Sequence, residues 1–144
     1  MDCPGILPIL TTGHQILFNQ LINMKKYIGL VLVMVAVYGI YFDTGKSVLK
    51  PESKGTLEEI SKLLKADANL KLYVVGHTDN TGTFDANMKL SMERASSVVN
   101  ALVSQHSVGA ASLKACGSGP ISPVATNDTE EGKALNRRVE LVKQ

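Results

Sequence analysis

The sequence contains no tryptophan, few aromatic residues of any kind and almost no excess of charge of either sign. Aromatic side chains make up 5% of its 144 residues, and the formal net charge is +2 at pH 7. A nucleic-acid-binding surface needs a basic stripe that follows the phosphates or an aromatic platform on which bases stack. The composition therefore argues against nucleic acid as a partner.

Cysteine is also scarce. The two cysteines, Cys3 and Cys116, lie far apart, and neither belongs to a CxxC motif or to a Cys/His cluster with metal-ligand spacing. The sequence does not decide whether the two form a disulfide. Cys116 is predicted to be a small buried apolar residue rather than a reactive thiol. His77 has only Asp79 nearby, whereas zinc needs three or four ligands. We therefore expect no bound metal and no cofactor, and a His77 that is hydrogen-bonded at a strand end.

Signals for catalysis and for phosphate binding are missing as well. The sequence has no nucleophile motif and no paired-carboxylate arrangement, and Gly117-Ser118-Gly119 is not followed by the Gly-Lys-Ser/Thr that opens a phosphate-binding helix. That glycine-rich stretch is predicted to form a turn. The sequence therefore predicts a protein without catalytic residues.

The first 32 residues differ in character from the rest of the chain. After Asp2 they contain no acidic residue, and a short positive segment from Met24 leads into an apolar run over residues 27–42. This combination is typical of an export signal, but a clean A-x-A cleavage site is missing. The run is also shorter than the roughly 20 residues of a transmembrane helix. Residues 1–32 are therefore predicted to be an N-terminal extension, with an export signal, a membrane anchor and a segment outside the fold as the alternatives.

Residues 33–144 carry the pattern of one α/β domain, because β-branched and apolar runs alternate with segments of helical periodicity. In chain order the predicted elements are a strand over 33–42, a helix from 51 to about 67–69, a strand over 70–75, a helix over 85–105, and strands over 113–117 and 138–142. The expected apolar positions are Leu57, Ile60 and Leu64 in the first helix, and Met88, Met92, Ala95, Val99 and Leu102 in the second.

The order β-α-β-α-β-β predicts a two-layer α/β sandwich, in which a mixed four-stranded sheet carries the two main helices on one face. The stretch from Gly119 to Asn136 is predicted to be a polar loop. Arg137 and Arg138 follow it, and both are predicted to have a structural role that ties the loop to the sheet.

Polar residues at the end of the central strand and on the second helix suggest a binding site. Asp79 lies in the loop after that strand, where α/β folds usually bind ligands, while Asn87, Ser91 and Arg94 fall on one side of the helix. An arginine facing a carboxylate suits a ligand that carries both a carboxylate and an ammonium group. The alternative is that Asp79 and Arg94 pair with each other and fix the loop to the helix.

Several of these residues form a recognisable set. The run Gly76-His77-Thr78-Asp79-Asn80-Thr81-Gly82, followed by Asn87, Leu90-Ser91, Arg94-Ala95 and Asn136-Arg137-Arg138-Val139-Glu140, resembles the OmpA-like C-terminal domain. Tyr41-Phe42-Asp43-Thr44-Gly45 resembles the first strand and turn of the same family. The spacing is kept over about two thirds of the chain.

The resemblance implies a non-catalytic periplasmic module that binds the diaminopimelate of the peptidoglycan stem peptide without a covalent bond. Asp79 and Arg94 would be the principal contacts, and Asp43, Thr44, Thr81 and Asn87 would be secondary ones. Such a module, associated with the outer membrane of a Gram-negative bacterium, would anchor that membrane or an envelope complex to the cell wall. Membrane association through the N-terminal segment stays open.

Two alternatives to this function remain at this point. One is an envelope protein-interaction module that has the same fold but no wall ligand. The other, less favoured, is a wall-acting hydrolase with His77 and Asp79 as acid and base.

Overall fold

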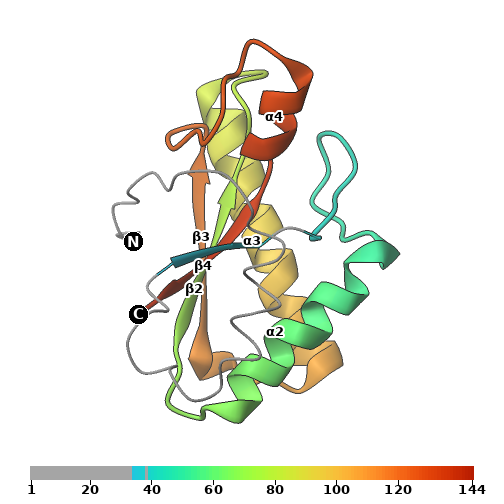
Figure 1. The fold of residues 1–144 in the computed structure, drawn as a ribbon, viewed down its shortest axis with the longest axis vertical. Coiled ribbons are helices and arrows are strands. Elements are labelled where there is room, and N and C mark those ends of the chain that lie inside the picture. Colours follow the sequence, from blue (N-terminus) through green and yellow to red (C-terminus); the bar gives the residue numbers. More distant parts are fainter. Residues whose placement is uncertain (1–33, 38) are drawn as a thin grey trace.

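The computed structural model describes residues 34–37 and 39–144 (Figure 1). In chain order the elements are β1 (Met34–Val37), a 3₁₀ turn (Pro51–Ser53), α2 (Lys54–Ala66), β2 (Leu72–His77), α3 (Phe84–His106), a second 3₁₀ turn (Ala110–Ser112), β3 (Leu113–Gly119), α4 (Glu130–Asn136) and β4 (Val139–Lys143). The predictions made for residues 1–32, and residues 33 and 38 of the predicted first strand, lie outside the described residues.

The strands form a mixed sheet. Their order is β1-β4-β2-β3, with β2 and β3 parallel and β4 antiparallel to both of its neighbours. A parallel pair needs a crossover connection, and α3 supplies it between β2 and β3. The carboxyl ends of these two strands therefore lie side by side, and the loops that leave them meet at one end of the sheet. The predicted mixed α/β class is confirmed.

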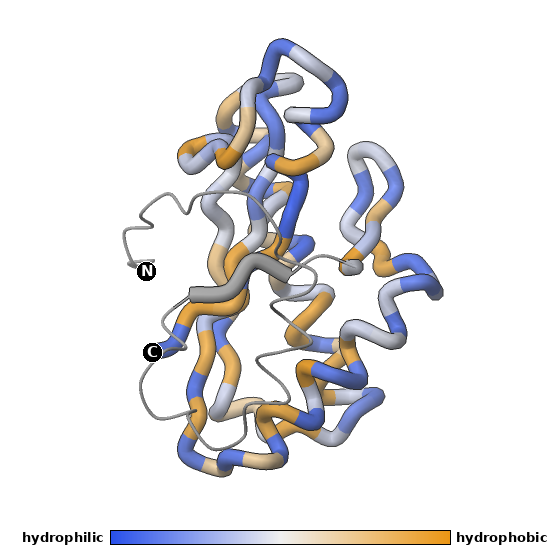
Figure 2. Tube along the Cα trace, in the orientation of Figure 1, coloured by the Kyte–Doolittle hydropathy of each residue, from blue (hydrophilic) through white to orange (hydrophobic). Residues whose placement is uncertain are grey.

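The main core lies between the sheet and the two long helices (Figures 1 and 2). It includes Leu57, Ile60 and Leu64 from α2, as predicted, together with Val98 and Leu102 from α3 and Leu72, Val74 and Leu141 from the strands. Neighbouring residues on the strands point to the opposite face because side chains alternate, and Val75, Cys116 and Val142 form a smaller cluster there. The prediction that Cys116 is buried is confirmed.

The predicted apolar side of α3 is only partly right. Ala95 and Leu102 are buried, whereas Met88, Met92 and Val99 are half-buried, and Val98 and Ala101 lie in the core instead. Hydropathy misplaces the stripe because the buried side of α3 also contains the polar residues Asn87, Ser91 and Arg94. The buried face of this helix is therefore partly a polar face.

Close packing of α3 on the ends of β2 and β3 depends on glycine. A Cβ on Gly76 would collide with the carbonyl oxygen of Ser91, and one on Gly117 would lie 2.6 Å from the backbone nitrogen of Met92. The Gly119 amide donates a hydrogen bond to Ser91 Oγ over 2.9 Å. Glycine permits such an approach of two backbones. The contact fixes α3 beside the strand ends that carry the candidate site.

Replacing Gly76 by alanine is expected to lower the free energy of unfolding by about 1–3 kcal/mol, because the added methyl group forces backbone to shift. Urea denaturation measures this loss. Gly55→Ala in α2 is the matched control, since its methyl group would meet nothing within 4 Å. Alanine is favoured over glycine in helices, so the control is expected to be neutral or stabilising. Equal destabilisation by both changes would contradict the close-packing argument.

Several boundaries differ from prediction. β2 begins and ends two residues later than predicted, and β3 continues through Gly119, so the glycine-rich stretch that was predicted to form a turn belongs to a strand. The predicted polar loop over 119–136 contains α4, whose first turn is capped by Thr129 Oγ1 accepting a hydrogen bond from the Gly132 amide at 3.1 Å. A helix of 7 residues is too short to show an apolar stripe, so periodicity missed it. The predicted first strand is too long, because β1 ends at Val37 and Gly39 adopts a left-handed φ of 99°.

Of the helices in the described part of the chain, none combines the length and the apolar character needed to cross a membrane.

Candidate functional site

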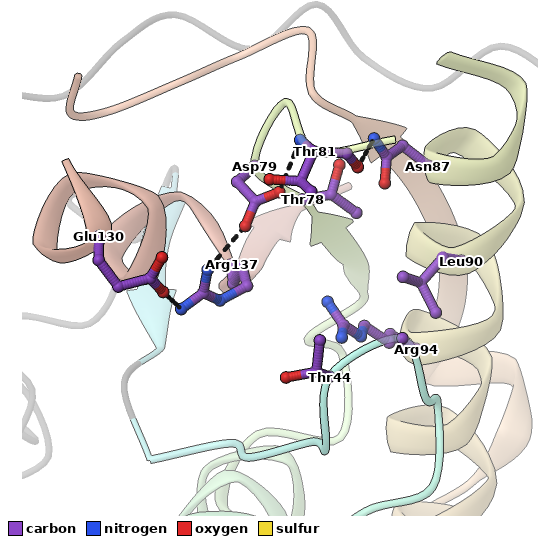
Figure 3. A pocket seen from close by; sticks show the side chains of 10 residues that line it. Thr44, Thr78, Asp79, Thr81, Asn87, Leu90, Arg94, Glu130 and Arg137 are labelled. Carbon is purple, nitrogen blue, oxygen red and sulfur yellow. Dashed lines mark hydrogen bonds and ion pairs between the residues drawn. The ribbon is translucent and has the colours of Figure 1, made fainter. Parts of the chain in front are cut away.

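A pocket of about 440 Å³ lies where the loops after β1 and β2 face the first half of α3 (Figure 3). It is lined by Thr44, Gly45, Thr78, Asp79, Thr81, Asn87, Leu90, Arg94, Glu130 and Arg137. A concave site with a few convergent polar groups is the usual form of a small-ligand site. The pocket brings together five of the six residues predicted as ligand contacts, namely Asp79, Arg94, Thr44, Thr81 and Asn87.

Asp79 is held in a fixed orientation by two donors. Its Oδ1 accepts a hydrogen bond from the Thr81 amide at 2.9 Å, and its Oδ2 accepts one from Arg137 Nη1 at 2.7 Å. Burial acts to raise the pKa of Asp79, but the hydrogen bonds from Arg137 and Thr81 outweigh it and hold the pKa below its usual value. The side chain is therefore a carboxylate at neutral pH, and each oxygen keeps a further lone pair for a ligand.

Arg94 reaches the pocket from α3 with most of its side chain buried. Its Nε donates to the carbonyl oxygen of Lys46 at 3.0 Å, and its Nη2 donates to that of Asp43 at 3.4 Å. The guanidinium lies over the ring of Phe42, 5.1 Å from the centroid. The loop after β1 thus orients Arg94 through neutral groups.

Arg94 forms no ion pair with any carboxylate among residues 39–144. Burial lowers the pKa of Arg94, the charge of Arg137 lowers it further, and the charge of Asp79 opposes both. Arginine nevertheless keeps its proton in proteins. A buried cation without a paired anion is unfavourable, so this part of the pocket is suited to a ligand that brings a negative group.

Asp43, the sixth predicted contact, is not among the pocket-lining residues. Its carboxylate instead lies 3.4 Å from Lys46 Nζ and 3.5 Å from Lys50 Nζ, and about half of the side chain is exposed. Its contribution to the pocket is the backbone carbonyl that orients Arg94.

Arg137 and Glu130 complete the lining on the side of α4. Arg137 Nη1 binds Asp79, while its Nη2 lies 2.6 Å from Glu130 Oε1. The hydrogen bond to Asp79 is the main reason that the pKa of Arg137 is raised. The alternative in which Asp79 pairs with Arg94 is therefore wrong, because its arginine partner is Arg137 (Figure 3).

The loop that carries Asp79 is fixed from two sides. Asn87 Nδ2, on α3, donates to the carbonyl oxygen of Thr81 at 2.9 Å. From the other side, the Asn80 amide donates to Asn127 Oδ1 at 3.3 Å, and Asn136 Nδ2 donates to the same oxygen at 2.9 Å. Asn87 therefore positions the loop, in addition to lining the pocket.

Comparison with known proteins gives the family. A family model described as the OmpA family matches residues 41–137. The chain belongs to the OmpA family. The probable lipoprotein YiaD of Escherichia coli (strain K12) is 44% identical to it over 102 residues, which make up 71% of this chain and 46% of that protein. The chain thus spans about half the length of this OmpA-family relative.

Solved structures agree with this membership. The crystal structure of the peptidoglycan-associated lipoprotein from Burkholderia pseudomallei matches with a TM-score of 0.67 and 33% identity, covering 73% of this chain and 88% of that one. The structure of the cell wall anchor of the T6SS from Pseudomonas aeruginosa matches with a TM-score of 0.64 and 29% identity, covering 77% and 80%. None of these relatives is named as an enzyme.

In this OmpA-family domain, the two arginines after α4 separate to different environments. Arg138 is buried, lies 2.7 Å from Glu140 Oε1 and donates to the carbonyl oxygen of Ser122 at 3.0 Å, so it ties the long loop to the sheet as predicted. Arg137 also makes structural contacts, because its ion pairs join the loop after β2 to the start of α4, but unlike Arg138 it lines the pocket. Alternation along an extended segment predicts opposite directions but not which arginine faces the site.

His77 is buried at the end of β2, and its Nε2 lies 3.3 Å from Glu140 Oε2. The two groups are close, but neither ring nitrogen of His77 meets the geometry of a hydrogen bond with any described residue, so the prediction of a hydrogen-bonded histidine side chain is wrong. Burial lowers the pKa of His77 more than Glu140 raises it, which leaves the imidazole neutral at pH 7. Residues 39–144 contain no cluster of three or more potential metal ligands.

Proposed function

We propose that this domain binds peptidoglycan non-covalently through the diaminopimelate of the stem peptide. It thereby anchors an envelope protein to the cell wall in the periplasm, at the outer membrane of a Gram-negative bacterium. Two kinds of observation support this. Relatives with the same fold are named as a peptidoglycan-associated lipoprotein and as a cell wall anchor. The pocket also has the chemistry that such a ligand requires.

The observation that carries the proposal is a buried arginine, Arg94, that has no carboxylate partner among the described residues and shares its pocket with the ionised Asp79. The free end of diaminopimelate has an ammonium and a carboxylate on one carbon. Asp79 takes the ammonium through charge-assisted hydrogen bonds, and Arg94 takes the carboxylate. This arrangement satisfies both charges of the ligand and supplies the anion that Arg94 lacks.

Secondary contacts come from residues that surround the pair. Thr81 and Thr44 offer hydroxyl groups from the two loops, and Asn87 holds the Thr81 loop in place. Asp43 acts through its backbone, by orienting Arg94. The domain needs no catalytic group or cofactor for this role, because recognition alone is required.

The test compares two stem tripeptides that differ only in the third residue. Lysine lacks the carboxylate that diaminopimelate carries beside its terminal ammonium, so the lysine peptide leaves Arg94 unpaired. Losing one partner of a desolvated charged contact costs about 2–5 kcal/mol, and we expect at least about thirty-fold weaker binding by calorimetry. Equal affinity for the two peptides would contradict the proposal. Release of soluble fragments from sacculi over time would instead favour a hydrolase.

A further inference from the structure

Of the two carboxylates that line the pocket, Asp79 and Glu130, only Asp79 has hydrogen bonds from the described residues to both of its oxygens. One of the two bonds comes from the backbone amide of Thr81, in the same loop as Asp79. Because donor and acceptor belong to one loop, this bond does not fix Asp79 relative to the rest of the pocket. The other bond comes from Arg137, which lies 58 positions after Asp79 in the sequence and directly follows the last residue of α4. The orientation of Asp79 relative to the rest of the pocket therefore depends on Arg137.

Arg137 is itself held by a second carboxylate. Its Nη2 binds Glu130 Oε1 in the first turn of α4, while Nη1 binds Asp79. The two nitrogens of one planar guanidinium thus connect α4 with the loop after β2. Since both nitrogens have carboxylate partners, Arg137 is a poor receptor for a ligand anion. Arg94, whose bonds go to neutral carbonyl oxygens, is the better one.

We infer that Arg137 is a positioning residue for ligand recognition, which orients the Asp79 carboxylate while Glu130 holds the guanidinium in place. The inference rests on the proposed function, because it assigns to Asp79 the ammonium group of the ligand. It adds a residue that does not itself contact the ligand carboxylate. The long loop and α4 become part of the binding apparatus through this one side chain.

The charges around Asp79 define what happens when Arg137 is removed. Arg137 faces Asp79 from the end of α4, Glu130 from the start of α4, and Arg94 from α3. The carboxylate of Asp43, in the loop after β1, forms ion pairs with Lys46 and Lys50. Burial acts to raise the pKa of Asp79, and the hydrogen bond from Arg137 is the largest of the effects that lower it. Without Arg137, Asp79 takes up a proton at a higher pH and loses its attraction for an ammonium group.

Arg137→Gln is the direct test. We expect affinity for the diaminopimelate tripeptide at pH 7 to fall about ten-fold, the value of one charge-assisted hydrogen bond. The pH below which binding is lost, called here the acid limit, is expected to move to a higher value because Asp79 takes up its proton at a higher pH. Lys133→Gln, on the same helix and with the same change in net charge, is the matched control and is expected to bind as the wild type does. Arg137→Lys keeps the positive charge but cannot bind Asp79 and Glu130 through two nitrogens of one planar group. We therefore expect its acid limit to be close to that of the wild type, while its affinity stays lower.

A second measurement separates this inference from the proposed function. NMR titration of the Asp79 carboxyl in ligand-free protein needs no ligand, and Arg137→Gln is expected to raise the pKa of Asp79 while Lys133→Gln leaves it unchanged. If the wild type fails to bind the tripeptide but the titration shifts as expected, the proposed ligand is wrong and Arg137 still positions Asp79. If the wild type binds and neither the titration nor the acid limit moves in Arg137→Gln, the positioning role is overturned.

Discussion

Arg94→Gln is expected to weaken binding to the diaminopimelate peptide by at least about thirty-fold and to abolish sedimentation with sacculi. Glutamine keeps a polar end but cannot form the charged, forked pair with a carboxylate. The ligand carboxylate would then meet a neutral amide in place of the buried cation of Arg94. Calorimetry with the peptide and co-sedimentation with purified sacculi measure the two effects.

Lys89→Gln is the matched control for this change. It removes a cation from the same helix, but at an exposed position that pairs only loosely with Glu93 at 3.9 Å. Undiminished binding is expected there. Arg94→Gln should remain folded in thermal denaturation, because Arg94 has no carboxylate in the described residues that would be left unpaired. Sedimentation of Arg94→Gln at the wild-type level would contradict the assignment of Arg94 as the carboxylate receptor.

The sequence was sufficient to place Asp79 and Arg94 in one pocket, because both follow from local patterns. Asp79 lies two residues after the buried strand β2, and Arg94 lies on the long helix α3, seven residues after Asn87 and therefore on the same side. The parallel arrangement of β2 and β3, with α3 between them, then brings loop and helix together. These are rules of short range combined with one rule of topology.

The partner of Asp79 could not be predicted in the same way. Arg137 is remote in sequence, and Glu130 belongs to a helix too short for its periodicity to be detected. Both depend on how the long loop after β3 folds back, and that path is fixed by Asn136, whose side-chain oxygen Oδ1 accepts hydrogen bonds from the backbone amides of Val124 and Ala125. Side-chain to backbone bonds of this kind leave no periodic signal in a sequence.

Ser91 shows the same limit on α3. The spacing of Asn87, Ser91 and Arg94 predicts that all three lie on one side of the helix, and all three do lie on its buried side. Ser91 is nevertheless fully buried against the Gly119 amide and is absent from the pocket lining. A shared helix face predicts direction, but the depth of packing decides which of its residues reach a ligand.

Glu140→Ala is expected to lower the free energy of unfolding by about 3–5 kcal/mol, because it leaves the buried cation of Arg138 uncompensated. Glu140 lies on β4, and Arg138 directly precedes that strand. Arg138 Nη2 is 2.7 Å from Glu140 Oε1, and each side chain is 3% exposed. His77, the other neighbour of Glu140, is neutral at pH 7 and carries no charge to balance. Urea denaturation at pH 7 measures the loss.

Two further variants distinguish the effect of a buried charge left without its partner from a simple loss of packing. Combining Glu140→Leu with Arg138→Met removes both charges and is expected to recover most of the lost stability, whereas Arg138→Met alone strands Glu140 and is expected to be destabilising. Glu58→Ala, at an exposed position of α2, is the control and is expected to change stability by less than about 0.5 kcal/mol. A double variant as unstable as Glu140→Ala would point to packing instead.

The pH dependence of the same pair has a definite sign. Burial acts to raise the pKa of Glu140, but the contact with His77 and the charge of Arg138 lower it below its ordinary value of 4.5. The stabilisation is therefore complete above that ordinary value and is lost as the pH falls through the lower folded value. Glu140→Ala has no such group to protonate, so the gap in stability between wild type and variant is expected to narrow in acid. A gap that stays constant from neutral to acidic pH would show that the charge of Glu140 is not what stabilises the fold.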